Sequence, residues 1–300
     1  MHHDVEHHVL VLEDLGALPT LNDYLALFSR EPSRLSASQE KACEKIGARI
    51  GGFFGELHSP QSLQRVVQSA SHSLTDASTR DLVYEMAVLP VKGHLEKYAI
   101  QDSSLLFART QQDFERPLIE GESCFILGDF HPGAVLLEAS GDGNQKMGII
   151  DWEFSCKGRG PNGDMAQCLG ALHVSLLSIP EDSEAFSATK ALIKGICSAY
   201  HQRLAGWVLG VEAKEGSLPT NSPLFLHLLR SALILHGCEI VNNAMDREWP
   251  PSFSLVDAVG LGVWYLRVAG DDVHQMTREA NWRRLLTEEH RIILDLFGIF

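Results

Sequence analysis

The chain has 300 residues, and 45% of them are hydrophobic, which is enough to bury a full core in one large domain or two modest ones. The formal net charge of −14 argues against nucleic acid or an anionic membrane as the main partner, because both require clustered Lys and Arg. The acidic balance is compatible with a cationic substrate. The six cysteines lack C-x-x-C and zinc-finger spacing, and no signal peptide is evident, so we expect free thiols and a cytoplasmic location.

The N-terminal region begins with the polar stretch "MHHDVEHH", which we interpret as a solvated chain end rather than a histidine metal site. A β-branched and aliphatic run, Val9 to Leu12, predicts a short strand that leads into a turn. The segment from Pro19 to Arg30 predicts a helix with Thr20 as its N-cap and Asp23 in its first turn.

A long helix is predicted from Ser36 to His58, because apolar residues recur there at three- and four-residue spacing. Its apolar face comprises Ile46, Ile50, Phe53, Phe54 and Leu57. Four glycines interrupt this helix, namely Gly47, Gly51, Gly52 and Gly55. Because each glycine in a helix costs about 1 kcal/mol relative to alanine, the four predict close approach of another backbone. Further helical segments are expected through Glu115, with breaks at "LPVKG" and at Pro117.

The pattern then changes to short strands. Three runs have strand character, namely Cys124 to Leu127, Val135 to Glu138 and Met147 to Ile150. The turn-forming segment "ASGDGNQK" predicts that the last two form a hairpin. After Asp151 the pattern is almost wholly helical, and its most apolar stretch, Leu224 to Gly237, is too short and too polar for a membrane span. The sequence therefore predicts an α+β, mostly helical domain with a small β-hairpin insert.

Three carboxylates follow these predicted strands. Asp129 lies in the loop "GDFHPG", and Asp151 ends the strand "MGIID". If the segment after Asp151 is extended, Glu153 lies on the same face as Asp151 and could join the same metal. Such a set suits a divalent cation with a phosphate, or a general base with a metal ligand, although an Asp in a loop is also a common turn former. A di-metal phosphoesterase is excluded, because Gln145 stands where its second motif needs an aspartate and no Gly-Asn-His occurs.

The order of "LGDFHPGAVLL", "IIDWEF" and "GDMAQCLGALH" resembles the C-lobe signature of the aminoglycoside phosphotransferase and choline kinase family. "HHVLVLEDLG" is similar to the last N-lobe strand and hinge of that family, and "IGARIGGFFGELHS" to its first long C-lobe helix. The resemblance implies a protein-kinase-like fold. Residues 1–16 would be an N-lobe remnant and residues 17–300 a helical C-lobe. Within that lobe, 125–138 would form the catalytic loop, 147–154 the metal-binding segment and 162–300 the substrate-side helices.

The resemblance also implies roles for individual residues. Asp129 would be the catalytic base for in-line phosphoryl transfer from ATP. Asp151 would hold Mg²⁺, and Glu153 would be a second metal contact, as in the similar Asp-x-Glu of methylthioribose kinases. His131 would brace the catalytic loop. Asp164 would cap the helix that it begins, and it could also help to hold the loop.

The resemblance also implies an adenine contact at the hinge, and the chain departs from the family pattern at two positions. The backbone of Glu13, Asp14 and Leu15 would hydrogen-bond the adenine. Leu127 stands where the family usually has His. Ala134 stands where it usually has a metal-ligating Asn, and alanine offers no oxygen ligand.

These features leave alternatives open. By resemblance, the protein is expected to phosphorylate a hydroxyl of a small molecule, which the acidic balance hints is amino-bearing. The sequence shows no Gly-rich loop or strand lysine before Val9, so activity is expected to be impaired. A pseudokinase that binds a small molecule or a protein is the second hypothesis, with self- or partner-association through an unpaired strand Val9 to Leu12. A helical scaffold without a site is the third.

Overall fold

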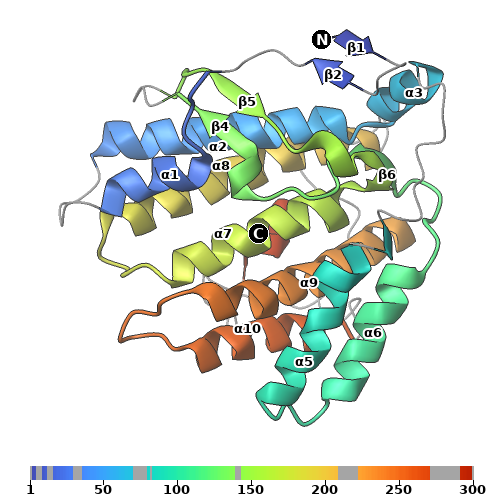
Figure 1. The fold of residues 1–300 in the computed structure, drawn as a ribbon, viewed down its shortest axis with the longest axis vertical. Helices are drawn as coiled ribbons and strands as arrows, with labels where there is room; N and C mark the ends of the chain where they lie inside the picture. Colours follow the sequence, from blue (N-terminus) through green and yellow to red (C-terminus); the bar gives the residue numbers. More distant parts are fainter. Residues whose placement is uncertain are drawn as a thin grey trace.

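The computed structural model describes residues 2–4, 9–11, 16–29, 36–69, 80–81, 83–138, 143–208, 222–270 and 291–298. Most of them are helical. The α-helices are α1 (Leu21–Ala26), α2 (Ala37–Leu57), α3 (Pro60–Ser69), α5 (Leu89–Lys97), α6 (Ser103–Glu115), α7 (Met165–Leu177), α8 (Glu184–Val208), α9 (Pro223–Asn243), α10 (Leu255–Val268) and α13 (Ile292–Leu296). In Figure 1 the long helices are stacked in layers, with α2 and α8 above α7, and α9 and α10 below it.

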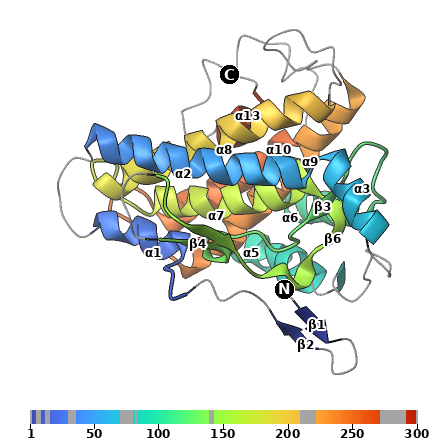
Figure 2. The ribbon, with the colours of Figure 1, turned by 90° about the horizontal axis from the view of Figure 1, so that it is seen from above.

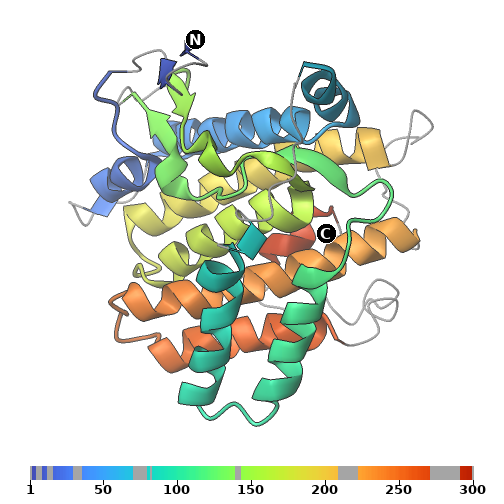
Figure 3. The same ribbon diagram turned by 45° about the vertical axis from the view of Figure 1, so that its right-hand side comes forward.

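Local sequence signals explain where several helices begin. Thr20 caps α1 and forms a capping box with Asp23, as the sequence predicts. Ser36 caps α2 in the same way with Gln39. The "LPVKG" segment does not break the helical region, because α5 begins at Leu89 and carries Pro90 in its first turn, where proline sacrifices no hydrogen bond. Figure 3 shows α5 and α6 as a pair that packs across α9.

The α2–α8 pair is the closest helix contact around the core. A Cβ atom at Gly47 would overlap the carbonyl oxygen of Leu192, and one at Gly51 would overlap that of Ile196. Gly55 faces the side chain of Arg203. The predicted close approach of another backbone is therefore confirmed for Gly47 and Gly51. It is wrong for Gly55, which meets a side chain, and for Gly52, which has no other atom near its Cβ position. Gly47 and Gly51 therefore let the backbone of α2 approach the backbone of α8.

Short strands form three antiparallel two-stranded sheets in the described part of the chain. The predicted hairpin is confirmed, since β4 (Val135–Leu137) pairs with β5 (Met147–Ile149). β3 (Ser123–Ile126) pairs instead with β6 (Cys156–Arg159), a strand that the expectation of helices after Asp151 misses. Because Asp129 follows β3 and Asp151 follows β5, the two residues follow strands of different sheets.

The N-terminal strand is present as β2 (Val9–Val11), while Leu12 lies outside the described residues. It pairs antiparallel with β1 (His2–Asp4), and His3 lies opposite Leu10. The expectation of an unpaired strand is therefore wrong, whereas the solvated chain end stays a prediction. Figure 2 shows β1 and β2 outside the stack of helices.

Helix α9 is a core element. It is apolar and, together with the 3₁₀ turn that follows it, long enough to cross a membrane, but 78% of its most apolar window is buried inside the protein. Phe225, Leu229 and Leu233 are among its buried side chains. The interpretation of this stretch as a buried helix is therefore supported.

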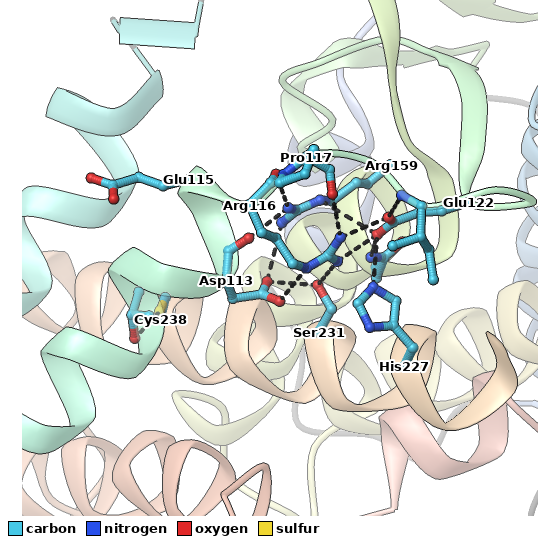
Figure 4. A network of polar contacts seen from close by, with 12 residues as sticks. Asp113, Glu115, Arg116, Pro117, Glu122, Arg159, His227, Ser231 and Cys238 are labelled. Atoms are coloured by element: carbon cyan, nitrogen blue, oxygen red, sulfur yellow. Dashed lines mark hydrogen bonds and ion pairs between the residues drawn. The ribbon is translucent and has the colours of Figure 1, made fainter. Parts of the chain in front are cut away.

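A buried charge network anchors the β3–β6 pair to the helices (Figure 4). Glu122 immediately precedes β3 and its side chain has no solvent exposure. Its carboxylate accepts hydrogen bonds from both terminal nitrogens of Arg116, at 2.7 and 2.5 Å, and from Nδ2 of Asn162 at 2.7 Å. His227 of α9 lies 3.6 Å from the same carboxylate.

The other half of this network connects α6, β6 and α9. Asp113 of α6 accepts hydrogen bonds from Nη1 of Arg159 at 3.1 Å and from the hydroxyl of Ser231 at 2.7 Å. Nε of Arg116 also lies 3.0 Å from Asp113. Buried charges are tolerated only when they are paired and hydrogen-bonded. The network therefore fixes the strand that leads into the loop of Asp129.

Candidate functional site

The loop after β3 begins with a sharp backbone turn at Gly128. This residue has φ +95°, and a Cβ atom there would overlap the carbonyl oxygen of Phe154. Both the conformation and the space require glycine. Gly128 therefore brings the loop that carries Asp129 into direct contact with the segment that follows Asp151.

Asp164 lies at the N-cap position of α7, but its side chain makes no capping hydrogen bond there and instead holds the backbone of the loop. Its carboxylate accepts hydrogen bonds from the N–H of Leu127 at 2.7 Å and of Gly128 at 3.0 Å. Nε2 of His58 lies 3.2 Å from the same carboxylate. Because a carboxylate only accepts, Nε2 of His58 is the donor, and in the neutral ring Nδ1 accepts from the hydroxyl of Tyr200 at 2.9 Å. A buried polar chain thus connects α2 and α8 to the loop.

Aromatic packing against α2 supports the loop that carries Asp129. Phe130 is completely buried and stacks on Phe54 of α2, with ring centroids 3.8 Å apart. Burial of Phe130 between two half-exposed neighbours pins the middle of the loop to the core. Asp129 and His131 therefore remain at the surface of the site while the residue between them is fixed.

Asp129 is held from α7. Its Oδ1 accepts a hydrogen bond of 2.6 Å from Nε2 of Gln167. Gln167 lies three residues after Asp164, at the start of the same helix. The two side chains therefore act together on the loop, Asp164 on its backbone and Gln167 on its carboxylate.

Asp151 occupies an unusual conformation for a residue other than glycine. Its φ of 63° and ψ of 48° lie in the left-handed region, which Asp and Asn tolerate best among side-chain-bearing residues. Such conformations cost of order 1–3 kcal/mol and cluster at functional sites. Oδ2 of Asp151 lies 3.6 Å from Nε2 of His131, and both side chains are about 40% exposed. The N–H of Ile150 donates to the carbonyl of Ala134 at 3.0 Å. The hairpin and the loop are thus joined at Asp151.

Glu153 does not share a strand face with Asp151. Residues Trp152–Phe154 form a 3₁₀ turn, and Glu153 is exposed on it, so the expectation of an extended segment is wrong. The tight turn follows from the left-handed conformation of Asp151 and is closed by the N–H of Ser155, which donates to the carbonyl of Trp152.

The described residues contain no group of three or more His, Cys, Asp or Glu side chains placed to hold a metal ion. Magnesium at nucleotide sites is commonly held by one or two carboxylates together with phosphate oxygens. Asp151 supplies one accessible carboxylate, and Glu153 carries a second on the adjacent turn. This donor set fits Mg²⁺ that arrives with a phosphate and does not fit a metal cage made by the protein alone.

The structure brings some of the predicted site residues together and leaves others apart. The structure brings His131 to Asp151 and brings Asp164 to the backbone of the loop that carries Asp129. Asp129 contacts Gln167 instead of the hairpin. The predicted adenine contacts, Glu13, Asp14 and Leu15, lie outside the described residues.

Two residues that the sequence reasoning did not single out lie on the α7 side of Asp129. One is Gln167, which hydrogen-bonds to Asp129, and the other is Glu239 of α9, which packs against Gly170 of α7 and is only 7% exposed. Burial raises the pKa of Glu239 to about 7, and the negative charge of Asp129 contributes to this rise. A polar side chain within the strongly apolar "LILHGCEIV" was the available signal for Glu239, because a lone carboxyl in a buried helix is rarely there for packing.

With this geometry in place, comparison with known proteins defines the class of the protein. The sequence profile of the phosphotransferase enzyme family matches residues 3–159, which is just over half of the chain. The chain therefore belongs to this family, and the resemblance to aminoglycoside phosphotransferases is confirmed.

Among curated proteins, the chain is similar to two fungal kinases. It is 26% identical over 177 residues to the 4-hydroxytryptamine kinase of Psilocybe cubensis, covering 57% of this chain and 45% of that protein. It is 26% identical over 175 residues to the 4-hydroxytryptamine kinase of Psilocybe cyanescens, with the same coverage. The match thus spans less than half the length of these relatives.

Proposed function

We propose that the protein transfers the terminal phosphoryl group of ATP to a hydroxyl of a small, amine-bearing molecule. The observation that carries the proposal is the fixed loop of Asp129, held by Asp164 and Gln167 against the Asp151 hairpin, in a member of the phosphotransferase family. The named activity of the two fungal relatives, on 4-hydroxytryptamine, supports an aromatic hydroxyl as the acceptor.

In this proposal Asp129 is the catalytic base. Gln167 donates to Oδ1, and no described residue hydrogen-bonds Oδ2, which can therefore receive the substrate hydroxyl. Oδ2 takes the proton while the hydroxyl oxygen bonds to the γ-phosphorus and the bond from that phosphorus to the bridging oxygen breaks, releasing ADP. Gln167 and Asp164 act as positioning residues, because they fix the carboxylate and the backbone that carries it.

Asp151 and Glu153 are proposed to hold magnesium. Mg²⁺, when bound with ATP, neutralises charge on the phosphates. Asp151 presents its carboxylate toward the loop of Asp129, and His131 limits its motion through the 3.6 Å contact. Residues 1–16 are proposed as the last N-lobe strand and the hinge, with the backbone of Glu13, Asp14 and Leu15 against adenine. Residues 17–300 are proposed as the C-lobe.

The test is ATP- and Mg²⁺-dependent phosphorylation of 4-hydroxytryptamine by the purified chain, compared with the Asp129→Asn variant. Loss of the base is expected to lower turnover by about 10²–10⁴-fold. The free energy of unfolding is expected to change by less than about 1 kcal/mol, since the Asn amide can still accept from Gln167. The surface variant Glu96→Gln removes one negative charge on α5 and serves as the control.

Ala134 favours a second candidate function. Its completely buried methyl group offers no metal ligand at the position where the family usually has Asn. The second candidate is a binding module that takes up the small molecule without phosphorylating it. The same experiment separates the two, because measurable turnover that depends on Asp129 contradicts the module. Binding of the compound without phosphate transfer contradicts the kinase.

A further inference from the structure

Glu239 is a buried carboxylate that the proposed chemistry does not use. Its Oε2 accepts a hydrogen bond of 2.9 Å from Nδ2 of Asn243, one helical turn away on α9. Its Oε1 accepts no hydrogen bond from the described residues, yet this atom is not among the completely buried unpaired ones. One oxygen of the side chain is therefore unpaired among the described residues and not completely buried.

No cation in the described part of the chain neutralises Glu239. Every ion pair there involves other acids, such as Asp102, Asp113 and Glu122. Placing a carboxylate in a buried position without a cation is costly, so such a group is normally paired, neutral or reserved for a ligand. The unpaired Oε1, which is not completely buried, favours the last of these.

The position of Glu239 points to the proposed substrate site. A Cβ atom at Gly170 of α7 would lie 2.5 Å from Cβ of Glu239, so the absence of a side chain there lets α9 come close. Gly170 lies one turn after Gln167, which holds Asp129. Glu239 and Asp129 therefore lie on the same side of α7, close enough for the charge of one to affect the ionisation of the other.

We propose that Glu239 binds the ammonium group of the substrate whose hydroxyl is presented to Asp129. This inference rests on the proposed function and names the residue that recognises the protonated amine of its substrate. Asn243 orients the carboxylate through Oε2, and the free Oε1 receives the ammonium. An ion pair in a site largely shielded from water is stronger than at the surface, so a neutral analogue is discriminated against.

The ionisation of Glu239 makes this recognition pH-dependent. Its pKa of about 7 means that the carboxyl is mostly protonated at pH 6 and mostly charged at pH 8, while an alkylammonium stays protonated throughout. Binding of the amine is therefore expected to strengthen as the pH rises from 6 to 8.

The neighbouring titratable groups on α9 change charge outside the range from pH 6 to pH 8. On α9 itself, burial lowers the pKa of His236 to about 3 and raises that of Cys238 to about 12. On α7, burial raises the pKa of Cys168 well above its usual range, and His173 hydrogen-bonds to His236. From the loop side, the negative charge of Asp129 contributes to the raised pKa of Glu239.

The test measures binding without catalysis, by calorimetry of the whole chain in the absence of ATP. Tryptamine is the ammonium probe, and tryptophol, in which a hydroxyl replaces the amine, is its neutral counterpart. The wild type is expected to bind tryptamine about tenfold more tightly than tryptophol at pH 8. This ratio is expected to fall at pH 6 and to approach one at both pH values in Glu239→Gln. The exposed-charge variant Glu96→Gln is expected to keep it.

Each outcome bears on one proposal. Equal affinities for the two probes in the wild type, or a ratio that survives Glu239→Gln, would overturn the inference even if phosphorylation is observed. Glu239-dependent binding of tryptamine without any phosphorylation would uphold the inference and reject the proposed kinase activity. The pH dependence in the wild type tests the inference without a variant, and Glu239→Asp, which keeps the charge on a shorter stem, is expected to retain part of the preference.

Discussion

The sequence locates single site residues best where they lie next to the end of a strand or at the start of a helix. Asp129, His131, Asp151 and Asp164 lie at strand ends or at a helix start, so their positions follow from the sequence order of the elements. Gln167 and Glu239 lie within helices, and their approach to Asp129 depends on how α7 and α9 pack. Periodicity places a residue on a helix but does not state which neighbour it meets, and for that reason the sequence pointed to the first group and missed the second.

The raised pKa of Glu239 leads to a prediction about stability. Its folded-state pKa of about 7 lies above the ordinary 4.5, so its neutral form stabilises the folded state below pH 4.5. That contribution is lost as the pH rises through 7. The loss amounts to about 3 kcal/mol, at 1.36 kcal/mol for each pKa unit. Glu239→Gln cannot ionise, so it does not lose this stability as the pH rises.

Urea unfolding at pH 5 and pH 8 is the measurement for this prediction. Between pH 5 and pH 8, the free energy of unfolding of Glu239→Gln is expected to rise relative to that of the wild type by up to about 3 kcal/mol. Relaxation of the folded state around the charge makes this rise smaller. The Glu96→Gln variant provides the baseline for an exposed carboxyl. Parallel pH profiles of the wild type and Glu239→Gln would show that Glu239 titrates normally and would contradict the prediction.

At the scale of elements, the sequence specifies helices better than strands. The starts of α1 and α2 follow from Thr20 and Ser36, whose caps are local interactions. The strand β6 escaped notice because "CKGR" has no apolar alternation and contains Gly158, which packs directly under Ile126. Its strand state comes from pairing with β3 and from the buried charge network, both of which are long-range.

The α2–α8 contact allows a matched comparison of two adjacent glycines. Gly51→Ala is expected to destabilise the protein by about 1–3 kcal/mol, because the new methyl group overlaps the carbonyl of Ile196. Gly52→Ala meets no other atom and is expected to stabilise it by up to about 1 kcal/mol through helix propensity. Chemical denaturation of both variants measures the two changes in the free energy of unfolding. Equal effects would mean that the helices can separate without loss.

At the scale of the whole molecule, the order of the motifs identifies the family, whereas long-range charge pairing holds the distant parts in place. Asp113, Arg116 and Glu122 lie between the end of α6 and the start of β3, whereas Arg159 lies in β6. Helix α9 adds Ser231 and His227 to this network. Burial alone would raise the pKa of Glu122. Hydrogen bonds, first among them that from Arg116, instead hold its pKa well below its usual range.

This balance predicts a large difference between two arginine-to-methionine substitutions. Arg116→Met leaves the fully buried Glu122 without its bidentate partner and is expected to destabilise the protein by about 3 kcal/mol or more. Arg267→Met breaks an ion pair with Asp102 that is equally short but exposed, and is expected to cost less than about 1 kcal/mol.

The difference between Arg116→Met and the wild type has a predictable pH dependence. The depressed pKa of Glu122 stabilises the folded state above pH 4.5 and ceases to do so as the pH falls through the folded-state value. Removing Arg116 raises that value, so the two proteins are expected to differ most at neutral pH and to converge as the pH drops below about 4. Thermal unfolding from pH 3 to pH 7 measures this convergence. A gap that stays constant over this range would assign the loss to packing of the arginine stem instead of to the uncompensated charge.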